Sequence, residues 1–143
     1  MGRCLGIDYG QRRIGLAIGD EEGIIAFPLG VIQNSGKQSV IKEIIRIIAE
    51  KTVDKIIVGL PLNMDGSKGP AVEGVEQFVN LLKAHVSLPI DVWDERLSTR
   101  MAEQAMIAGG LSRRRRRESI DQSTAQIILQ SYLDAHDKQS LPE

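Results

Sequence analysis

The stretch GIDYGQRRIGLAIGD, residues 6–20, decides the fold class of this chain. It contains the end of the first and the whole of the second of three short apolar runs, which lie at 3–9, 13–19 and 24–32 and are separated by glycine-bearing turns. Such runs are typical of an antiparallel β-meander. Asp8 stands near the end of the first run, where a buried charge is costly unless it is paired or binds a metal ion. The stretch therefore predicts the start of a sheet and a candidate site residue, although Asp8 could simply open a turn with Gly10.

Downstream of this meander, helical and strand patterns alternate. Apolar stripes at helical spacing follow Ser35-x-x-Gln38, a candidate capping box, and Pro70, which suits a first helical turn. The remaining expected elements are strands at 55–60 and 89–93, a short helix capped by Ser98 or Thr99 and ending at Gly109-Gly110, and a last helix from Ser119 to about His136. Strands joined through helices pair in parallel. The sequence thus predicts one α/β domain over 1–143, with a mixed five-stranded sheet and flanking helices.

Composition excludes several classes of protein. The chain has 143 residues, of which 42% are apolar, so it can form a folded domain. Its 18 basic and 19 acidic residues give a net charge of −1, which does not indicate a nucleic-acid binder. Cys4 is the only cysteine, which excludes an internal disulfide and a cysteine metal cluster. Because neither a targeting signal nor a long apolar stretch is present, we expect a cytoplasmic protein without a membrane partner.

Two other places carry carboxylates that a purely structural role does not favour. In a helix beginning near Ser119, Asp121 falls on the apolar, sheet-facing stripe, which continues through Thr124, Ala125, Ile128 and Tyr132. The alternative is a first-turn acid stabilised by the helix dipole. Asp94 and Glu95 follow the strand at 89–93, at the edge where ligands gather in α/β sheets. Strand alternation places these two on opposite sides, and their spacing does not decide which one faces a site.

Together these acids form an oxygen-donor set without a histidine or cysteine cluster, since His85 and His136 have the pattern of ordinary surface or partly buried residues. Carboxylate oxygens suit Mg²⁺ or Mn²⁺, as one or two ions. Two such ions about 4 Å apart can activate water and stabilise the leaving oxygen of a phosphodiester. The residues therefore predict phosphodiester chemistry.

A basic segment precedes Asp121. From Arg96 to Arg117 seven arginines (96, 100 and 113–117) stand against one acid, Glu103, a local balance of +6. Adjacent arginines repel one another, so we expect 113–117 to form a mobile, solvated loop that binds phosphate through bidentate contacts. The alternative is a segment that only solubilises the chain or contacts another protein. Because aromatic residues do not interleave with the arginines, base stacking is not expected to be the main binding term.

Four motifs give this chain a family resemblance over nearly its whole length. GIDYGQRRIGLAIGD (6–20), IIVGLPLNMDGS (56–67), VWDERLST (92–99) and SIDQSTAQIILQSYLD (119–134) resemble the bacterial YqgF family of Holliday-junction-resolvase-like pre-16S rRNA nucleases. The resemblance implies an RNase H-like fold and a nuclease that processes the 5′ side of a ribosomal RNA precursor. It implies that Asp8, Glu95 and Asp121 are the catalytic and metal-binding residues, preferring Glu95 over Asp94. Glu95 would replace the acid that many RNase H-like enzymes carry one strand earlier. The expected nucleic-acid contacts are Arg12, Arg13, Arg96, Arg113, Arg114, Arg115, Arg116 and Arg117.

Several functions stay open at this point. The leading one is a metal-dependent endonuclease of structured RNA, with pre-rRNA as partner. Cleavage of branched DNA at Holliday junctions is an alternative that usually needs a two-fold dimer, and the sequence does not decide between monomer and homodimer. A sugar-kinase-like phosphotransferase would need two such domains, and 143 residues supply one. A non-catalytic RNA-binding factor of ribosome assembly would bind without metal and without cleavage.

Overall fold

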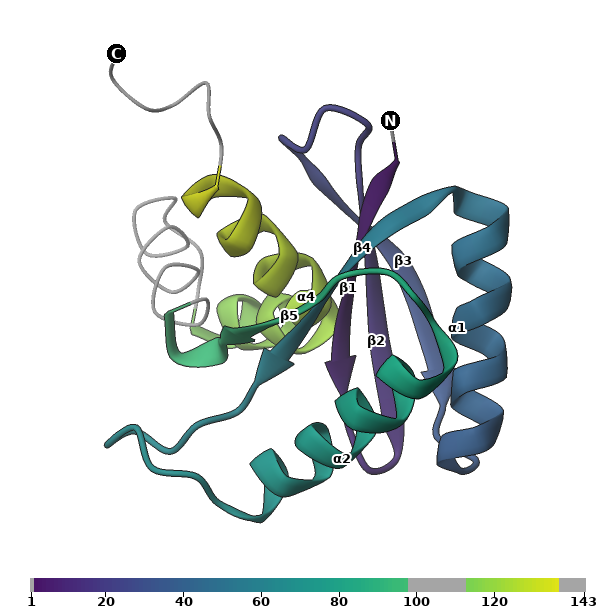
Figure 1. Ribbon diagram of the computed structural model, residues 1–143. Helices are drawn as coiled ribbons and strands as arrows, with labels where there is room; N and C mark the ends of the chain where they lie inside the picture. Colours follow the sequence, from purple (N-terminus) through teal and green to yellow (C-terminus); the bar gives the residue numbers. More distant parts are fainter. Residues whose placement is uncertain (1, 98–112, 137–143) are drawn as a thin grey trace.

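A computed structural model describes residues 2–97 and 113–136, with side chains described for all of these except 113–123 (Figure 1). The elements are β1 (Arg3–Tyr9), β2 (Arg13–Gly19), β3 (Ala26–Gln33), α1 (Lys37–Lys51), β4 (Val53–Leu60), α2 (Pro70–His85), β5 (Ile90–Asp94) and α4 (Arg113–Ala135). The short helix predicted between Ser98 and Gly110 lies outside the described residues. Within the described part of the chain, no helix combines the length and the hydropathy that crossing a membrane requires.

The five strands form one sheet in the order β3-β2-β1-β4-β5. The first three strands pair antiparallel, whereas β4 pairs in parallel with both β1 and β5. This arrangement confirms the predicted mixed sheet. It also aligns the carboxyl ends of β1, β4 and β5 at one edge, which is where the acids predicted as site residues lie.

Strand alternation gives the two faces of the sheet different contents. Leu5 and Ile7 of β1 are fully buried in a large apolar cluster with residues of α1 and α2. These two helices cover one face of the sheet (Figure 1). The alternate positions Gly6 and Asp8 face the other side of the sheet, which α4 covers. A Cβ atom at Gly6 would lie 2.8 Å from Cβ of Leu129, so the absence of a side chain lets α4 pack closely on the sheet.

Two predicted helix starts are wrong. Helix α1 begins at Lys37 with Gly36 as its N-cap residue and without a side-chain cap hydrogen bond, so Ser35 does not cap this helix. Helix α4 begins at Arg113 and not at Ser119. Arginine is a good helix former, and no glycine or proline separates Arg113 from Ser119. The expectation of a loop at 113–117 is therefore wrong, because intrinsic propensity prevails there over charge repulsion.

Candidate active site

Asp8 stands at the carboxyl end of β1 on the face that α4 covers. Its register partner on β2 is Gly15, and a Cβ atom there would lie 3.6 Å from Cβ of Asp8. The carboxylate is half-buried, and this burial raises the pKa of Asp8 above its ordinary value. A turn with Gly10 is thus not its whole role, because the side chain points into the space beneath α4.

Glu95 follows β5 directly and faces the same side of the sheet. It packs beside Gly59 of β4, where a Cβ atom would lie 3.0 Å from Glu95 Oε2 and 2.6 Å from Ile128 Cδ1. Burial, followed by the negative charges of Asp8 and Asp94, raises the pKa of Glu95 to about 7. The structure therefore brings Asp8 and Glu95 together across a glycine of the intervening strand.

Asp94 points to the opposite side and is neutralised there. Its carboxylate accepts hydrogen bonds from Arg96, with Nη2 of Arg96 2.7 Å from Oδ2, and this partner lowers the pKa of Asp94. Arg96 also donates from Nη1 to the carbonyl oxygen of Met64 at 3.2 Å. Alternation alone leaves the choice between Asp94 and Glu95 open, whereas the structure places Glu95 beside Asp8. The expected phosphate contact from Arg96 stays a prediction. In the structure, the guanidinium of Arg96 binds Asp94 and the carbonyl oxygen of Met64.

Asp121 belongs to α4, but its side chain lies outside the described residues. Thr124, three positions later on the same helix, lines a pocket with Asp8. The convergence of Asp121 with the other two acids therefore stays a prediction. The arginines at 113–117 share this status, because only their helical backbone is described.

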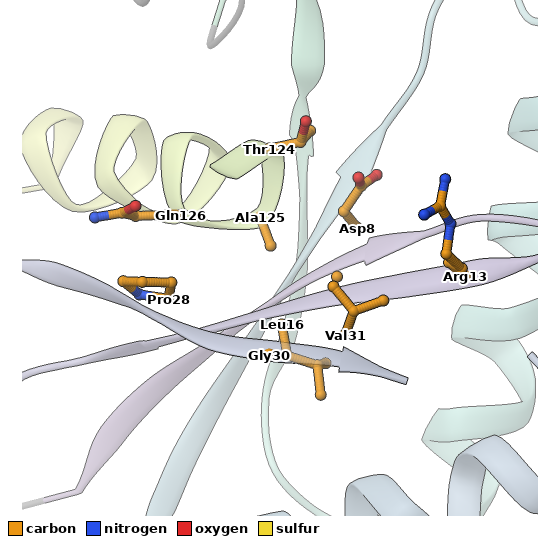
Figure 2. A pocket seen from close by; sticks show the side chains of 10 residues that line it. Asp8, Arg13, Leu16, Pro28, Gly30, Val31, Thr124, Ala125 and Gln126 are labelled. Carbon is orange, nitrogen blue, oxygen red and sulfur yellow. The ribbon is translucent and has the colours of Figure 1, made fainter. Parts of the chain in front are cut away.

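The pocket beside Asp8 has a volume of about 450 Å³ and lies between α4 and strands β2 and β3 (Figure 2). Figure 2 shows Asp8 between Thr124 of α4 and Arg13 of β2. Pro28 and Val31 of β3 form an apolar wall, and Val31 is 59% exposed. Arg12 lies exposed in the turn that precedes β2. The pocket thus combines a carboxylate, a guanidinium and an apolar surface, which could hold a phosphate and the sugar attached to it.

The donor set fits a hard cation in part. Among the described side chains, neither Asp8 nor Glu95 has a lysine or arginine partner, and their charges repel each other. No group of three or more histidine, cysteine, aspartate or glutamate residues that could hold a metal ion occurs in that part of the chain. Carboxylate oxygens such as those of Asp8 and Glu95 are nevertheless the ligands that Mg²⁺ or Mn²⁺ prefers. A third carboxylate would come from Asp121.

Two glycines that shape the site were not among the predicted site residues. Gly59 leaves room for Glu95 and Ile128, whereas a Cβ atom at Gly15 would make ordinary van der Waals contact with Asp8. An isolated glycine inside a strand pattern indicates that another group approaches closely, so Gly59 carried a readable signal. What the sequence does not show is which group approaches, because α4 reaches these strands from far along the chain.

Comparisons with known proteins identify the family and agree with the observed fold. The family model RuvX, described as Holliday junction resolvase, matches residues 2–135. A protein of Clostridium tetani named "Putative pre-16S rRNA nuclease" is 47% identical over 133 residues, covering 93% of this chain and 96% of that protein. One of the same name from Clostridioides difficile is 44% identical over 133 residues, covering 93% and 94%. T. thermophilus RuvC in complex with a Holliday junction substrate shares the fold, with a TM-score of 0.63 and 15% identity over 100% of both chains.

Proposed function

This chain belongs to the RuvX family, described as Holliday junction resolvase, and we propose that it is a metal-dependent endonuclease that processes the 5′ end of pre-16S rRNA. The observation that carries the proposal is the neighbouring pair Asp8 and Glu95, two half-buried carboxylates without a basic partner among the described residues. The names of relatives at 44–47% identity support RNA as the substrate. Membership of the family agrees with the resemblance that the four motifs predicted.

Asp8, Glu95 and Asp121 would hold one or two Mg²⁺ or Mn²⁺ ions. Such ions activate water and stabilise the leaving oxygen when a phosphodiester is hydrolysed. The chain itself contributes position and the partial burial of both carboxylates. Gly59 and Ile128 enclose Glu95 on one side, and Gly15 and Ala125 border Asp8 on the other. Both carboxylates must be ionised to act as ligands, which the raised pKa values of Asp8 and Glu95 oppose until a cation balances their charge.

Binding of the phosphate backbone would come from arginines around this centre. Arg13 lines the Asp8 pocket, and Arg12 precedes it in the turn. Helix α4 begins with five consecutive arginines, about two to three turns before Thr124, which lines the Asp8 pocket. Each arginine that binds a phosphate adds about 0.7–0.9 to the slope of log affinity against log salt. Neutralising 113–117 should therefore weaken binding of unrelated sequences alike and flatten that slope.

Parallel cleavage assays would test the proposal. Structured RNA containing the 5′ region of pre-16S rRNA and a four-way DNA junction are each incubated with Mg²⁺, with Mn²⁺ or with EDTA. Cleavage of the RNA that requires the ions and disappears in the Asp8→Asn protein is expected. Asp54→Asn provides the control, since Asp54 lies at the other end of β4 and is exposed.

Junction cleavage is the second candidate, favoured by the description of the family. Preferential cutting of the DNA junction by a dimer would establish it in place of RNA processing. Binding of RNA that persists in EDTA, with no cleavage under any condition, would instead support a non-catalytic assembly factor.

A further inference from the structure

A second pocket, of about 350 Å³, opens at the free edge of the sheet beside β5. Strand β5 ends the strand order, with α4 on one side of it and α2 on the other (Figure 1). Three rings gather here from two distant parts of the chain, Trp93 of β5 with Tyr132 and His136 at the end of α4. The volume of this pocket lies in the range of small-ligand sites, roughly 300–1,000 Å³.

These rings are held in place by contacts with one another and by hydrogen bonds. Tyr132 and His136 stack with centroids 4.1 Å apart, and Trp93 meets Tyr132 edge-on at 5.5 Å. Trp93 Nε1 donates to Ser131 Oγ at 3.0 Å, and the Tyr132 hydroxyl donates to Asp91 Oδ2 at 3.0 Å. A platform whose rings are already fixed loses little conformational entropy when a ligand binds.

Exposure differs among the three rings in a way that leaves one surface open. Tyr132 is only 4% exposed and forms the floor of the cluster. His136 is exposed and Trp93 is half-buried, so both still present ring surface to the pocket. Lys83 of α2 lines the same pocket. Flat rings beside a lysine are the chemistry that binds a nucleobase together with its phosphate.

The pocket lies beside the candidate active site. Trp93 lies on β5, and Glu95 follows it two residues later, just after the strand ends. We propose that Trp93 and His136 form a stacking site for an unpaired nucleobase of the substrate, with Lys83 at the adjoining phosphate. The inference rests on the proposed function, in that the ligand is a nucleic acid.

The single tryptophan of the chain makes the site directly observable. We would titrate the protein in EDTA, at constant salt, with a short single-stranded RNA and with an abasic strand of equal length. The RNA is expected to quench the fluorescence of Trp93 in a saturable way. The abasic strand, which has phosphates but no rings, should bind without that quenching.

The matched variants are His136→Ala and His85→Ala. Both histidines lie at the end of a helix, with Nδ1 hydrogen-bonded to the carbonyl oxygen four residues earlier, of Tyr132 at 2.8 Å and of Leu81 at 2.9 Å. Loss of one stacking ring should weaken RNA binding about tenfold for His136→Ala and leave His85→Ala unchanged. Lys83→Ala should weaken binding of the RNA and of the abasic strand alike.

Equal quenching by the abasic strand, or unchanged RNA affinity of His136→Ala, would overturn the stacking site. So would quenching by an extended peptide but not by RNA, which would make this edge a protein-binding surface. The outcome is separable from that of the nuclease proposal. Base-dependent quenching in a protein that cleaves nothing refutes only the nuclease, whereas cleavage without such quenching refutes only the stacking site.

Discussion

The two faces of the sheet carry different kinds of residues although the same strands form both. Toward α1 and α2, β1 contributes Leu5 and Ile7, which are fully buried among large aliphatic side chains. Toward α4, the same strand contributes Gly6 and Asp8, and its neighbour β4 contributes Gly59. The α4 face also buries an apolar cluster, but glycines there let a helix and two carboxylates approach the strands closely.

This difference separates the sources of stability from the sources of chemistry. Burial of apolar surface stabilises the fold by about 25 cal/mol per Å², and the larger of the two buried apolar clusters lies on the α1/α2 face. On the α4 face, burial has the opposite effect on the carboxylates, since it raises the pKa values of Asp8 and Glu95. Carboxylates whose pKa is raised by burial are candidates for function, because stability alone does not favour burying them.

The largest expected effect tests the α4 face. Asp8→Asn keeps the volume of the side chain and removes the charge that would hold a cation, so cleavage should fall by more than about 100-fold. Folding and most RNA binding should be unaffected, because the arginines remain. Cleavage rates and binding titrations on the same preparation check both statements. Undiminished cleavage would remove Asp8 from the site.

Ile7→Ala tests the α1/α2 face, since Ile7 is the neighbour of Asp8 in the chain and lies on the opposite face of the sheet. Ile7 has no exposed surface, so its truncation leaves a cavity and should lower the free energy of unfolding by about 2–5 kcal/mol. Urea denaturation measures this loss. Cleavage per folded molecule should stay near that of the wild type at a temperature where the variant is folded. A selective loss of cleavage in the folded variant would mean that the two faces are coupled.

The sequence predicts this division for local reasons. Alternation along β1 separates Ile7 from Asp8, and alternation at the end of β5 separates Asp94 from Glu95, so both pairs can be assigned to opposite faces without a structure. The choice between Asp94 and Glu95 is not local. It depends on Arg96, which folds back on Asp94, and on Gly59, which leaves the space that Glu95 enters.

The parts that the sequence does not predict depend on distant contacts or on competing local terms. Trp93 and Tyr132 are far apart in the chain and show no common spacing, so their cluster becomes visible only when α4 is placed on β5. At Arg113 two local terms oppose each other, charge repulsion and helix propensity, and pattern reasoning has no means of weighing them. The direction of the Asp121 side chain stays a prediction.

Glu95 and Asp94 should respond to pH with opposite signs. The unfolded pKa of glutamate is 4.5 and the folded pKa of Glu95 is about 7, so the folded protein binds more protons between these values. Stability in EDTA should therefore fall as pH rises from about 4.5 to 7, and Glu95→Gln should remove that fall. At pH 8 the variant should be more stable, on the order of 1–2 kcal/mol after allowance for partial solvent screening.

Asp94→Asn is the matched control for this experiment. Because Arg96 lowers the pKa of Asp94, the carboxylate contributes stability above its unfolded pKa of 3.8, and this contribution is lost as pH falls through the lower folded value. The variant should thus be slightly less stable than the wild type at neutral pH. Thermal unfolding across the pH range measures both variants. If the stability of Glu95→Gln and of the wild type changed with pH in the same way, the pKa of Glu95 would not be raised in the folded protein.

The smallest effect concerns how the α4 face holds its substrate. Arg13 lines the Asp8 pocket at the start of β2, whereas Arg3 lies at the opposite end of the sheet, at the start of β1. If Arg13 binds one phosphate, Arg13→Ala should weaken RNA binding only several-fold and should reduce the slope of log affinity against log salt by about 0.7–0.9. Arg3→Ala should leave that slope unchanged, because its charge lies far from the pocket. Equal slopes for all three proteins would mean that phosphate does not enter the pocket beside Asp8, and the apolar wall of Pro28 and Val31 would then need another ligand.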